Sequence, residues 1–450
     1  MTKGSPVAFY VGICLSDSRW PSHPDWLRKG MLHSVSDFKR SLRAKGRGRS
    51  GTWSEWAWAR LIHAKGLWRV LIACAVMSVG YAYPAVLHLG DRIIGDSSEH
   101  ALLSIRDLWW VKPALQTPGL RVFHTDHIFH PEGVSLYFHT PVPLYGLFSI
   151  PFQLIWNLAV AHNLIVLVSF IIGGFTAFLL ARYVLRDESA AFVAGAAFSF
   201  SAYHIGRAMG HINLVLIQWL PLYALLLLKT ADSEWFAVAA GTCLLLILLV
   251  DLHYLFHCAL LTAVYAFYIL RLAKAERAQM VQHIKLLAIV GLIFVLLGLP
   301  VFMPMVSEAA SSPGTYPDAT EVPYHSADLL SYFTPIQYQF LYDGRFGHIR
   351  STLLQEPYEG HNLVGYVCLA LGVIGLRAAW RQERRKGLFW MGVVLFLWTL
   401  SLGPRLHVQG QTEFTKLEAL VLLPHAFLHK LPIAGISRAV GRVSVMVLLG

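Results

Sequence analysis

Eleven apolar runs alternate with short polar stretches along the chain, and they predict a bundle of hydrophobic helices. A helix needs roughly 17–25 apolar residues to cross a bilayer, and most of these runs approach that length. The runs lie at 66–88, 143–160, 162–182, 188–203, 213–229, 235–250, 254–270, 286–305, 361–378, 387–403 and 433–450. We therefore expect an all-α polytopic membrane protein.

Charge in the connecting segments predicts how the chain crosses the membrane. The segments 271–285 and 377–386 are rich in Lys and Arg, whereas the charged residues of 306–360 are mostly Asp and Glu. Basic segments stay on the cytoplasmic side, so 306–360 is predicted to be exported. These assignments agree only if the proline-rich run 143–160 enters the membrane without crossing it, which leaves ten spans and a cytoplasmic N-terminus.

Composition supports a membrane protein with a basic tail. Only 14% of the 450 residues are charged and 56% are hydrophobic, which excludes a soluble cytosolic protein. Residues 1–65 hold twelve Lys and Arg against four Asp and Glu. This excess predicts a tail attracted to anionic lipid and not to nucleic acid. We expect a membrane domain over 66–450, with exported loops at 89–160, 306–360 and 404–431.

The first exported loop offers a pair of carboxylates at the start of a predicted surface helix. Leu102, Ile105 and Trp109 recur at helical spacing, which predicts an amphipathic helix on the membrane surface. Asp96 and Glu99 precede this helix. They are either catalytic groups or the two ends of a capping box, in which Asp96 accepts backbone N–H groups.

Further along the same loop, His124 and Asp126 lie close to two more histidines, His127 and His130. Imidazole and carboxylate groups bind divalent metals such as zinc, so a divalent metal is a candidate cofactor here. The spacing matches no strict motif, and histidines at the membrane interface are the alternative.

Three later polar clusters fall at predicted exported turns. They contribute His204, Arg207 and His211, then Asp251, and finally Arg438 and Arg442. Cations spaced by three or four residues lie on one helix face and can grip a lipid phosphate. The alternative is that the arginines only reach towards the membrane surface. A carboxylate such as Asp251 between apolar helices is costly unless it is paired or functional.

The order of several short motifs resembles the bacterial branch of the GT-C membrane glycosyltransferases. These motifs are "HPEGVSLYFHT", "FSFSAYHIGRAMGHINLVLIQWLPLYALLL", "SADLLSYFTP", "EGHNLVGYVCLAL", "SLGPRLHVQG" and "RAVGRVSV", and the resemblance runs from about residue 66 to the end. It implies a GT-C-like bundle in a bacterial inner membrane. It also implies transfer of a sugar from a polyprenyl-phosphate donor to a glycan, lipid or protein acceptor.

The resemblance also suggests roles for individual residues. Asp96 matches by position the first-loop carboxylate that acts as catalytic base in that family, and Arg438 and Arg442 match phosphate contacts. Members of the family often place two acidic residues together at the base, whereas here Glu99 follows Asp96 by three positions. The chain ends inside an apolar run, so it is expected to be a truncated member.

Two other classes remain open. A transporter or flippase for lipid-linked sugars would show inverted repeats and charges near the bilayer midplane, and the sequence shows neither. A non-catalytic membrane protein that keeps the fold is the second alternative.

Overall fold

The computed structural model describes residues 66–139, 141–271, 277–311, 322, 324–338, 345–353, 360–382, 384–412, 423–428 and 439–449. The predicted tail 1–65, part of 404–431 and Arg438 lie outside this part of the chain. In the described part, the secondary structure is helical apart from a two-stranded antiparallel hairpin and two isolated bridges. The prediction of an all-α protein is confirmed at this level.

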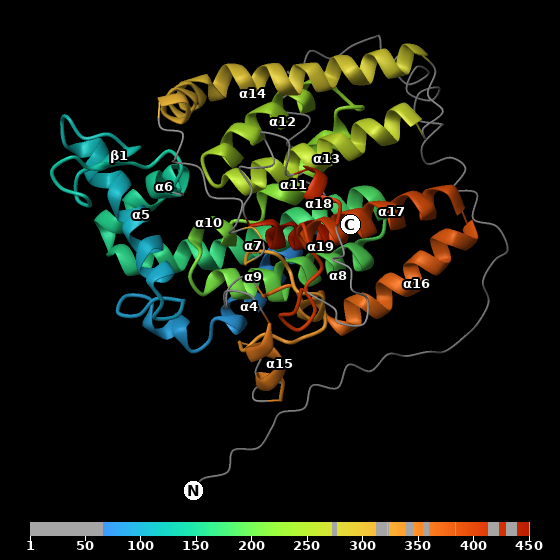
Figure 1. Cartoon of the computed structure of the whole chain (residues 1–450), viewed down its shortest axis with the longest axis horizontal. Helices are drawn as coiled ribbons and strands as arrows, with labels where there is room; N and C mark the ends of the chain where they lie inside the picture. The colour runs from blue at the N-terminus through green and yellow to red at the C-terminus, as the bar shows by residue number, and fades with distance from the viewer. Residues whose placement is uncertain are drawn as a thin grey trace, which may run out of the picture. The chain divides into compact units, whose positions relative to one another are not determined.

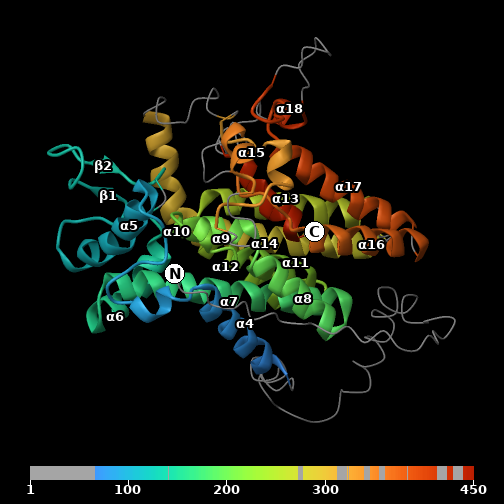
Figure 2. The ribbon, with the colours of Figure 1, turned by 90° about the horizontal axis from the view of Figure 1, so that it is seen from below.

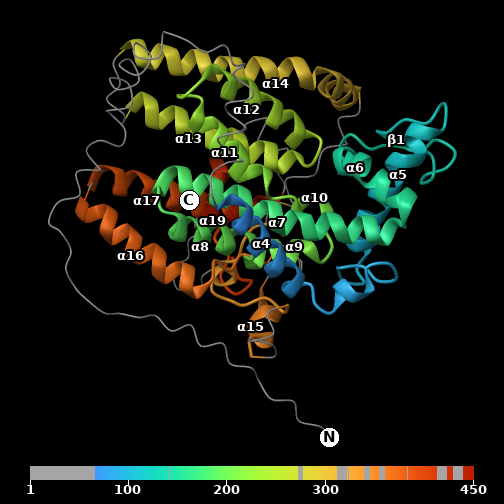
Figure 3. The same ribbon diagram turned by 180° about the vertical axis from the view of Figure 1, so that it is seen from behind.

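The first half of the described chain forms the loop predicted to be exported first and the helices packed against it (Figure 1). Its elements are α4 (Leu67–Tyr81), η1 (Ala85–His88), α5 (Glu99–Gln116), β1 (His124–Thr125), β2 (Val134–Ser135), α6 (Pro143–Ile155), α7 (Leu158–Leu185), α8 (Glu188–Ser199), α9 (Ala202–Ala208), α10 (Ile212–Val215) and α11 (Trp219–Lys229). Helices α5 and α6 and the hairpin gather at one end of this unit, as Figures 2 and 3 also show.

The second half adds three longer helices and several short ones. Its elements are α12 (Glu234–Leu248), α13 (Leu252–Arg271), α14 (Arg277–Ser311), η4 (Leu329–Tyr332), α15 (Gly347–Thr352), α16 (Tyr366–Gln382), α17 (Arg384–Ser401), α18 (His425–Leu428), η7 (Val440–Val443) and α19 (Ser444–Leu449). Helix α14 packs along α12, and α16 packs beside α17 (Figure 1). The helix α14 extends to Ser311, so the predicted loop 306–360 begins as helix.

Three helices of the described residues are long and apolar enough to span a membrane by length and composition. They are Leu158–Leu185, Leu252–Leu270 and Arg277–Ser311. The other apolar helices are shorter, because turns and polar caps end them early. For example, α8 ends at Ser199 after 12 residues, and Ser201 caps the next helix by accepting the N–H of His204 at 3.4 Å. At 1.5 Å per residue α8 covers roughly 18 Å, less than a bilayer core of about 30 Å.

The run 143–160 is divided between two helices. Pro143 occupies the first turn of α6, where its missing N–H costs nothing, and the helix ends at Ile155 after 13 residues. Asn157 then caps α7 by accepting the N–H of Val160 at 2.9 Å. The break between α6 and α7 therefore lies inside the run that hydropathy alone would join.

Small residues let the helix backbones approach closely. A Cβ on Gly195 of α8 would lie 2.5 Å from the carbonyl oxygen of Gly174 on α7, and one on Gly241 of α12 would lie 2.7 Å from that of Val290 on α14. Such contacts are typical of membrane helices, where packing and not water exclusion holds helices together. The core beside them contains fully buried side chains, including Phe170, Leu216, Ile217, Tyr223, Ile247, Leu400 and Val443.

Candidate functional site

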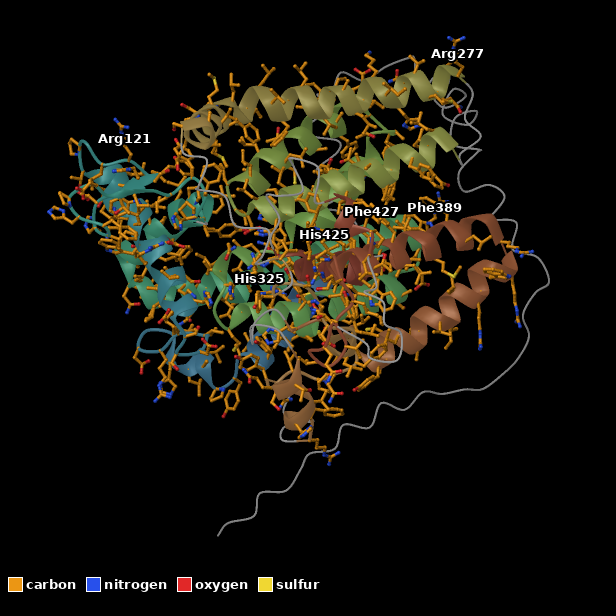
Figure 4. All side chains as sticks on the ribbon, viewed as in Figure 1. Arg121, Arg277, His325, Phe389, His425 and Phe427 are labelled. Atoms are coloured by element: carbon orange, nitrogen blue, oxygen red, sulfur yellow. The ribbon has the colours of Figure 1, made fainter. Side chains whose placement is uncertain are left out.

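Contacts between distant segments gather at two separate ends of the helices. We call one the histidine-rich end; it comprises 89–139, 202–213, 251–257, 325–338, 361–362, 401–411 and 439–442. We call the other the arginine-rich end; it comprises 182–188, 229–235, 265–285 and 380–389. Figure 4 shows the labelled Arg277 and Phe389 at the arginine-rich end, whereas Arg121 projects from the hairpin on the opposite side.

Asp96 lies half-buried where three segments of the histidine-rich end meet. Its backbone N–H donates to the carbonyl of Met209 at 2.8 Å. Its carboxylate accepts the N–H of Ser98 at 3.0 Å and the hydroxyl of Tyr338 at 3.2 Å. Asp96 is thus held by residues 113 and 242 positions away in the chain.

The predicted capping box at the start of α5 is wrong. The helix begins at Glu99, and Ser98 is its N-cap, with its hydroxyl accepting the N–H of Ala101 at 3.3 Å. Asp96 lies two residues before the cap, because the tight contact of Gly95 and Asp96 with Met209 delays the helix. Glu99 occupies the exposed first turn, where a carboxylate favours the helix dipole.

The candidate metal residues of the hairpin do not form a metal centre. His124 and Asp126 are both exposed, and Asp126 approaches the ring of His127 at 3.3 Å. Among the described residues, no three His, Cys, Asp or Glu side chains come close enough to hold a metal ion. The hairpin tip separates His124 from His130, which is also exposed, so the four residues do not converge.

Two residues predicted to bind phosphate are buried inside the fold. His204 has no exposed surface and its ring nitrogens contact the carbonyls of Ser199 at 2.6 Å and Val215 at 2.7 Å. Burial lowers the pKa of His204 to about 4, so its ring is neutral. Arg207 is also fully buried, with its guanidinium over the ring of Tyr203 at 4.9 Å. Neither side chain lies at a surface, so both interpretations of Arg207 as a surface group are wrong.

His211 is less buried and connects the first loop to the segment 202–215. Its ring stacks on that of His100 with centroids 4.5 Å apart. Beside it, the hydroxyl of Ser104 donates to the carbonyl of Gly210 at 2.7 Å and accepts the N–H of Ile212 at 3.1 Å. The start of α5 is therefore fixed against this segment.

Asp251 is the centre of a buried polar network at the turn between α12 and α13. Its carboxylate accepts hydrogen bonds from the side-chain amide of Asn213 at 2.6 Å and from the backbone N–H of His253 at 2.7 Å. It also contacts the ring of His253 at 3.1 Å. Burial alone would raise the pKa of Asp251. The neighbouring His253, together with Arg442 and Asn213, holds that pKa below its ordinary value.

Arg442 joins this network from the other end of the chain. Its guanidinium lies 3.4 Å from Nδ1 of His253, and it is only partly buried. It belongs to η7, whose Gly441 donates its N–H to the carbonyl of His325 at 2.9 Å. Arg438, the predicted partner of Arg442, lies outside the described residues.

Sequence reasoning missed three residues of this end. Tyr338 and His361 lie beside each other, with ring centroids 5.9 Å apart, and a Cβ on Gly206 would collide with the His361 ring. Asp328 is fully buried and accepts the N–H of Leu330 and of Gly410, each at 2.8 Å. The motif "SADLLSYFTP" contains Asp328 and was a possible signal, whereas nothing in the sequence marks Tyr338.

A family model described as a domain of unknown function (DUF6311) matches residues 72–448. The chain belongs to the DUF6311 family. The match includes every described residue of the histidine-rich and arginine-rich ends and leaves out the basic tail 1–65. No curated protein sequence matches the chain.

The DUF6311 domain has a small cavity beside Asp251. Apolar and aromatic side chains line most of it, among them Phe123, Tyr137, Val142, Leu249, Val301 and Met305. Asp251 and His139 are its polar lining residues besides Tyr137. The hydroxyl of Ser135 donates to Glu308, which ties the hairpin to the end of α14 next to this cavity. The cavity therefore borders the buried Asp251 network at Asp251 itself.

Proposed function

We propose that this DUF6311 protein is an inverting membrane glycosyltransferase that uses a polyprenyl-phosphate sugar as donor. One observation carries the proposal: a half-buried carboxylate, Asp96, and a buried network with an arginine, Arg442, are held by the same short segment. Asp96 contacts Met209, and Asp251 contacts Asn213. The base and the cation that this chemistry requires are thus attached to the 202–215 segment.

The chemistry assigns a separate task to each group. An acceptor hydroxyl attacks the anomeric carbon of the sugar and loses its proton to Asp96. The bond between that carbon and the phosphate oxygen breaks, and the electron pair leaves with the phosphate. Arg442 stabilises the charge that develops on the phosphate, as a guanidinium suits phosphate oxygens. Arg207, being buried, acts only through the residues it supports.

Two features support Asp96 as the base. Its carboxylate accepts hydrogen bonds from Ser98 and Tyr338, which fix its orientation. It is not the N-cap of α5, so capping does not account for it. A fixed carboxylate at the junction of three segments is typical of a functional group and costly as a purely structural one.

We also propose ten spans, a cytoplasmic N-terminus and a location in a bacterial inner membrane. Contacts support the arrangement, because segments predicted to be exported contact one another. Asp96 contacts Tyr338, and Arg442 contacts His253. Segments predicted to be cytoplasmic do the same, as Lys285 does Glu234. The shorter helices would span with the help of their flanking residues and local thinning of the bilayer.

The substitution Asp96→Asn tests the proposed function. Asparagine keeps the shape and can still accept the N–H of Ser98, but it cannot take up a proton. We expect transfer from a polyprenyl-phosphate sugar to fall by roughly 10²-fold or more, with the thermal midpoint unchanged. Asp91→Asn, in the same loop but exposed, is the matched control and should keep full activity.

Transfer that survives Asp96→Asn would contradict the proposal. It would leave a transporter of lipid-linked sugars or a non-catalytic membrane protein as the better explanation. A loss of folding together with activity would show that Asp96 has a structural role only.

A further inference from the structure

Two histidines at the start of α13 have ring nitrogens that lack a hydrogen-bond partner among the described residues. His253 and His257 are four residues apart, so they lie on the same face of the helix. His257 is fully buried. Among the described residues, Nε2 of His253 and both ring nitrogens of His257 are buried and have no hydrogen-bond partner. Native proteins rarely leave such atoms unsatisfied, which points to a ligand.

The charges around these rings decide which ligand fits. Histidines four apart on one helix face are also a zinc-binding pattern. Here, however, the guanidinium of Arg442 lies 3.4 Å from the ring of His253, and a cation would be repelled by it. The one carboxylate of the cluster, Asp251, is already occupied by Asn213 and by backbone N–H groups. N–H donors without a free carboxylate suit an anion.

The small cavity beside α14 lies next to the start of this cluster. Asp251 and Leu252 line this cavity, and His253 follows them directly in the chain. Asp251 contacts Nδ1 of His253, and this contact fixes the ring so that Nε2 faces the other way. A small shift of the Arg442 side chain, which is partly exposed, would open the space between it and the rings.

We propose that His253, His257 and Arg442 form a binding site for a phosphate group. The phosphate oxygens accept N–H bonds from His257, from the guanidinium and from Nε2 of His253 when that ring carries both protons, with its Nδ1–H donating to Asp251. The inference deepens the proposed function, on which it rests, because the donor's phosphate would be this anion. Binding can nevertheless be measured without turnover.

The experiment is a titration of the purified full chain in detergent with two probes, inorganic phosphate and a short-chain isoprenyl phosphate. We expect the double variant His253→Gln, His257→Gln to bind at least tenfold more weakly. Binding of both probes identifies a phosphate site, and binding of the isoprenyl phosphate alone identifies a lipid headgroup site. Arg442→Lys, which keeps the charge but loses the planar fork, should weaken binding roughly tenfold, about 1.4 kcal/mol.

Two controls separate this inference from the proposed function. His283→Gln, at the arginine-rich end, should bind both probes like the parent chain. Asp96→Asn should also bind normally while losing transfer. If the histidine variants lose phosphate binding and the parent shows no transfer, the site stands and the glycosyltransferase proposal fails.

Three results would overturn the inference. They are a parent chain that binds neither probe, a double histidine variant that binds as well as the parent, and stoichiometric zinc binding that the double variant abolishes. Should the double variant fail to fold, as judged by gel filtration, the partly exposed Arg442→Lys still decides the matter. Parent-like binding by a folded Arg442→Lys would remove Arg442 from the site.

Discussion

The two ends of the helices treat charge in opposite ways. At the histidine-rich end, Arg207 and Asp251 are almost completely buried. At the arginine-rich end, Lys285 and Glu234 form an ion pair at 3.4 Å with both side chains about 60% exposed. Arg182 and Glu188 pair at 2.9 Å with their side chains 33% and 62% exposed. Paired charges therefore lie at the surface at one end, whereas the other end also encloses charged residues in its interior.

This difference indicates where selection for chemistry acts. Exposed ion pairs contribute roughly 0–1 kcal/mol, so we expect the arginine-rich end to tolerate change. Buried charges cost several kcal/mol unless their partners are complete. The network of Asp251, Asn213 and His253 meets that condition, and it does so beside the cavity.

The first prediction tests whether the two ends lie on opposite sides of a membrane. If the two ends lie on opposite sides of a membrane, reporter domains fused after Lys285 and after Pro335 should report opposite compartments. Lys285 lies at the arginine-rich end and Pro335 at the histidine-rich end. Alkaline phosphatase and green fluorescent protein fusions measure this as an all-or-none signal. Identical signals from both positions would remove the membrane orientation and the assignment of Asp96 to the exported face.

The second prediction tests the buried network directly. Asp251→Ala leaves Asn213 and His253 without their acceptor and Arg442 without its nearest carboxylate. We expect a loss of roughly 3–5 kcal/mol in the free energy of unfolding, the usual cost of breaking a buried charge network. Thermal unfolding in detergent measures it. The exposed Asp232→Ala, at the arginine-rich end, is the control and should change stability by less than about 0.5 kcal/mol.

The pH dependence of stability provides a second test of the Asp251 network. The pKa of Asp251 is lower in the folded chain than in the unfolded one. Its contribution to stability is therefore present above the ordinary aspartate pKa of about 3.9 and is lost as the pH falls below it. The parent and Asp251→Ala should consequently converge in stability in strong acid. A constant difference across pH would contradict the role of the ionised carboxylate.

Much of the architecture could be predicted from the apolar runs, because hydropathy is additive along the chain. A helix in the first loop and a break within 143–160 followed from local patterns, and the structure has both, although Asp107 of the predicted polar side is buried while Leu102 is exposed. The lengths of the helices could not be predicted in the same way. Breaks such as the one at Ser201 and the turn between α10 and α11 interrupt helices inside apolar runs, and their effect depends on local geometry.

The site was less predictable because its contacts are non-local. Asp96 was identified from its position in the first loop, but its partner Tyr338 lies 242 residues away and follows no periodic pattern. His204 and Arg207 were misinterpreted for the same reason. Their spacing on one helix face is correct, but α7 and the segment around Val215 cover that face. Sequence spacing gives a residue's direction on a helix, and only packing decides whether water or protein lies there.

The last prediction concerns the smallest effect, at the arginine-rich end. Lys285 and Glu234 link the start of α14 to the start of α12, but both side chains are exposed and water competes for their charges. We expect the double-mutant cycle of Lys285→Ala and Glu234→Ala to give a coupling of about 0.5 kcal/mol or less, vanishing in high salt. Thermal unfolding at two salt concentrations measures it. Removing Lys285 should also leave the reporter orientation unchanged, because Arg277, Arg381 and Arg384 keep this end positively charged. A coupling as large as that expected for the Asp251 network would show that both ends depend equally on charge, and the contrast between them would no longer mark the functional end.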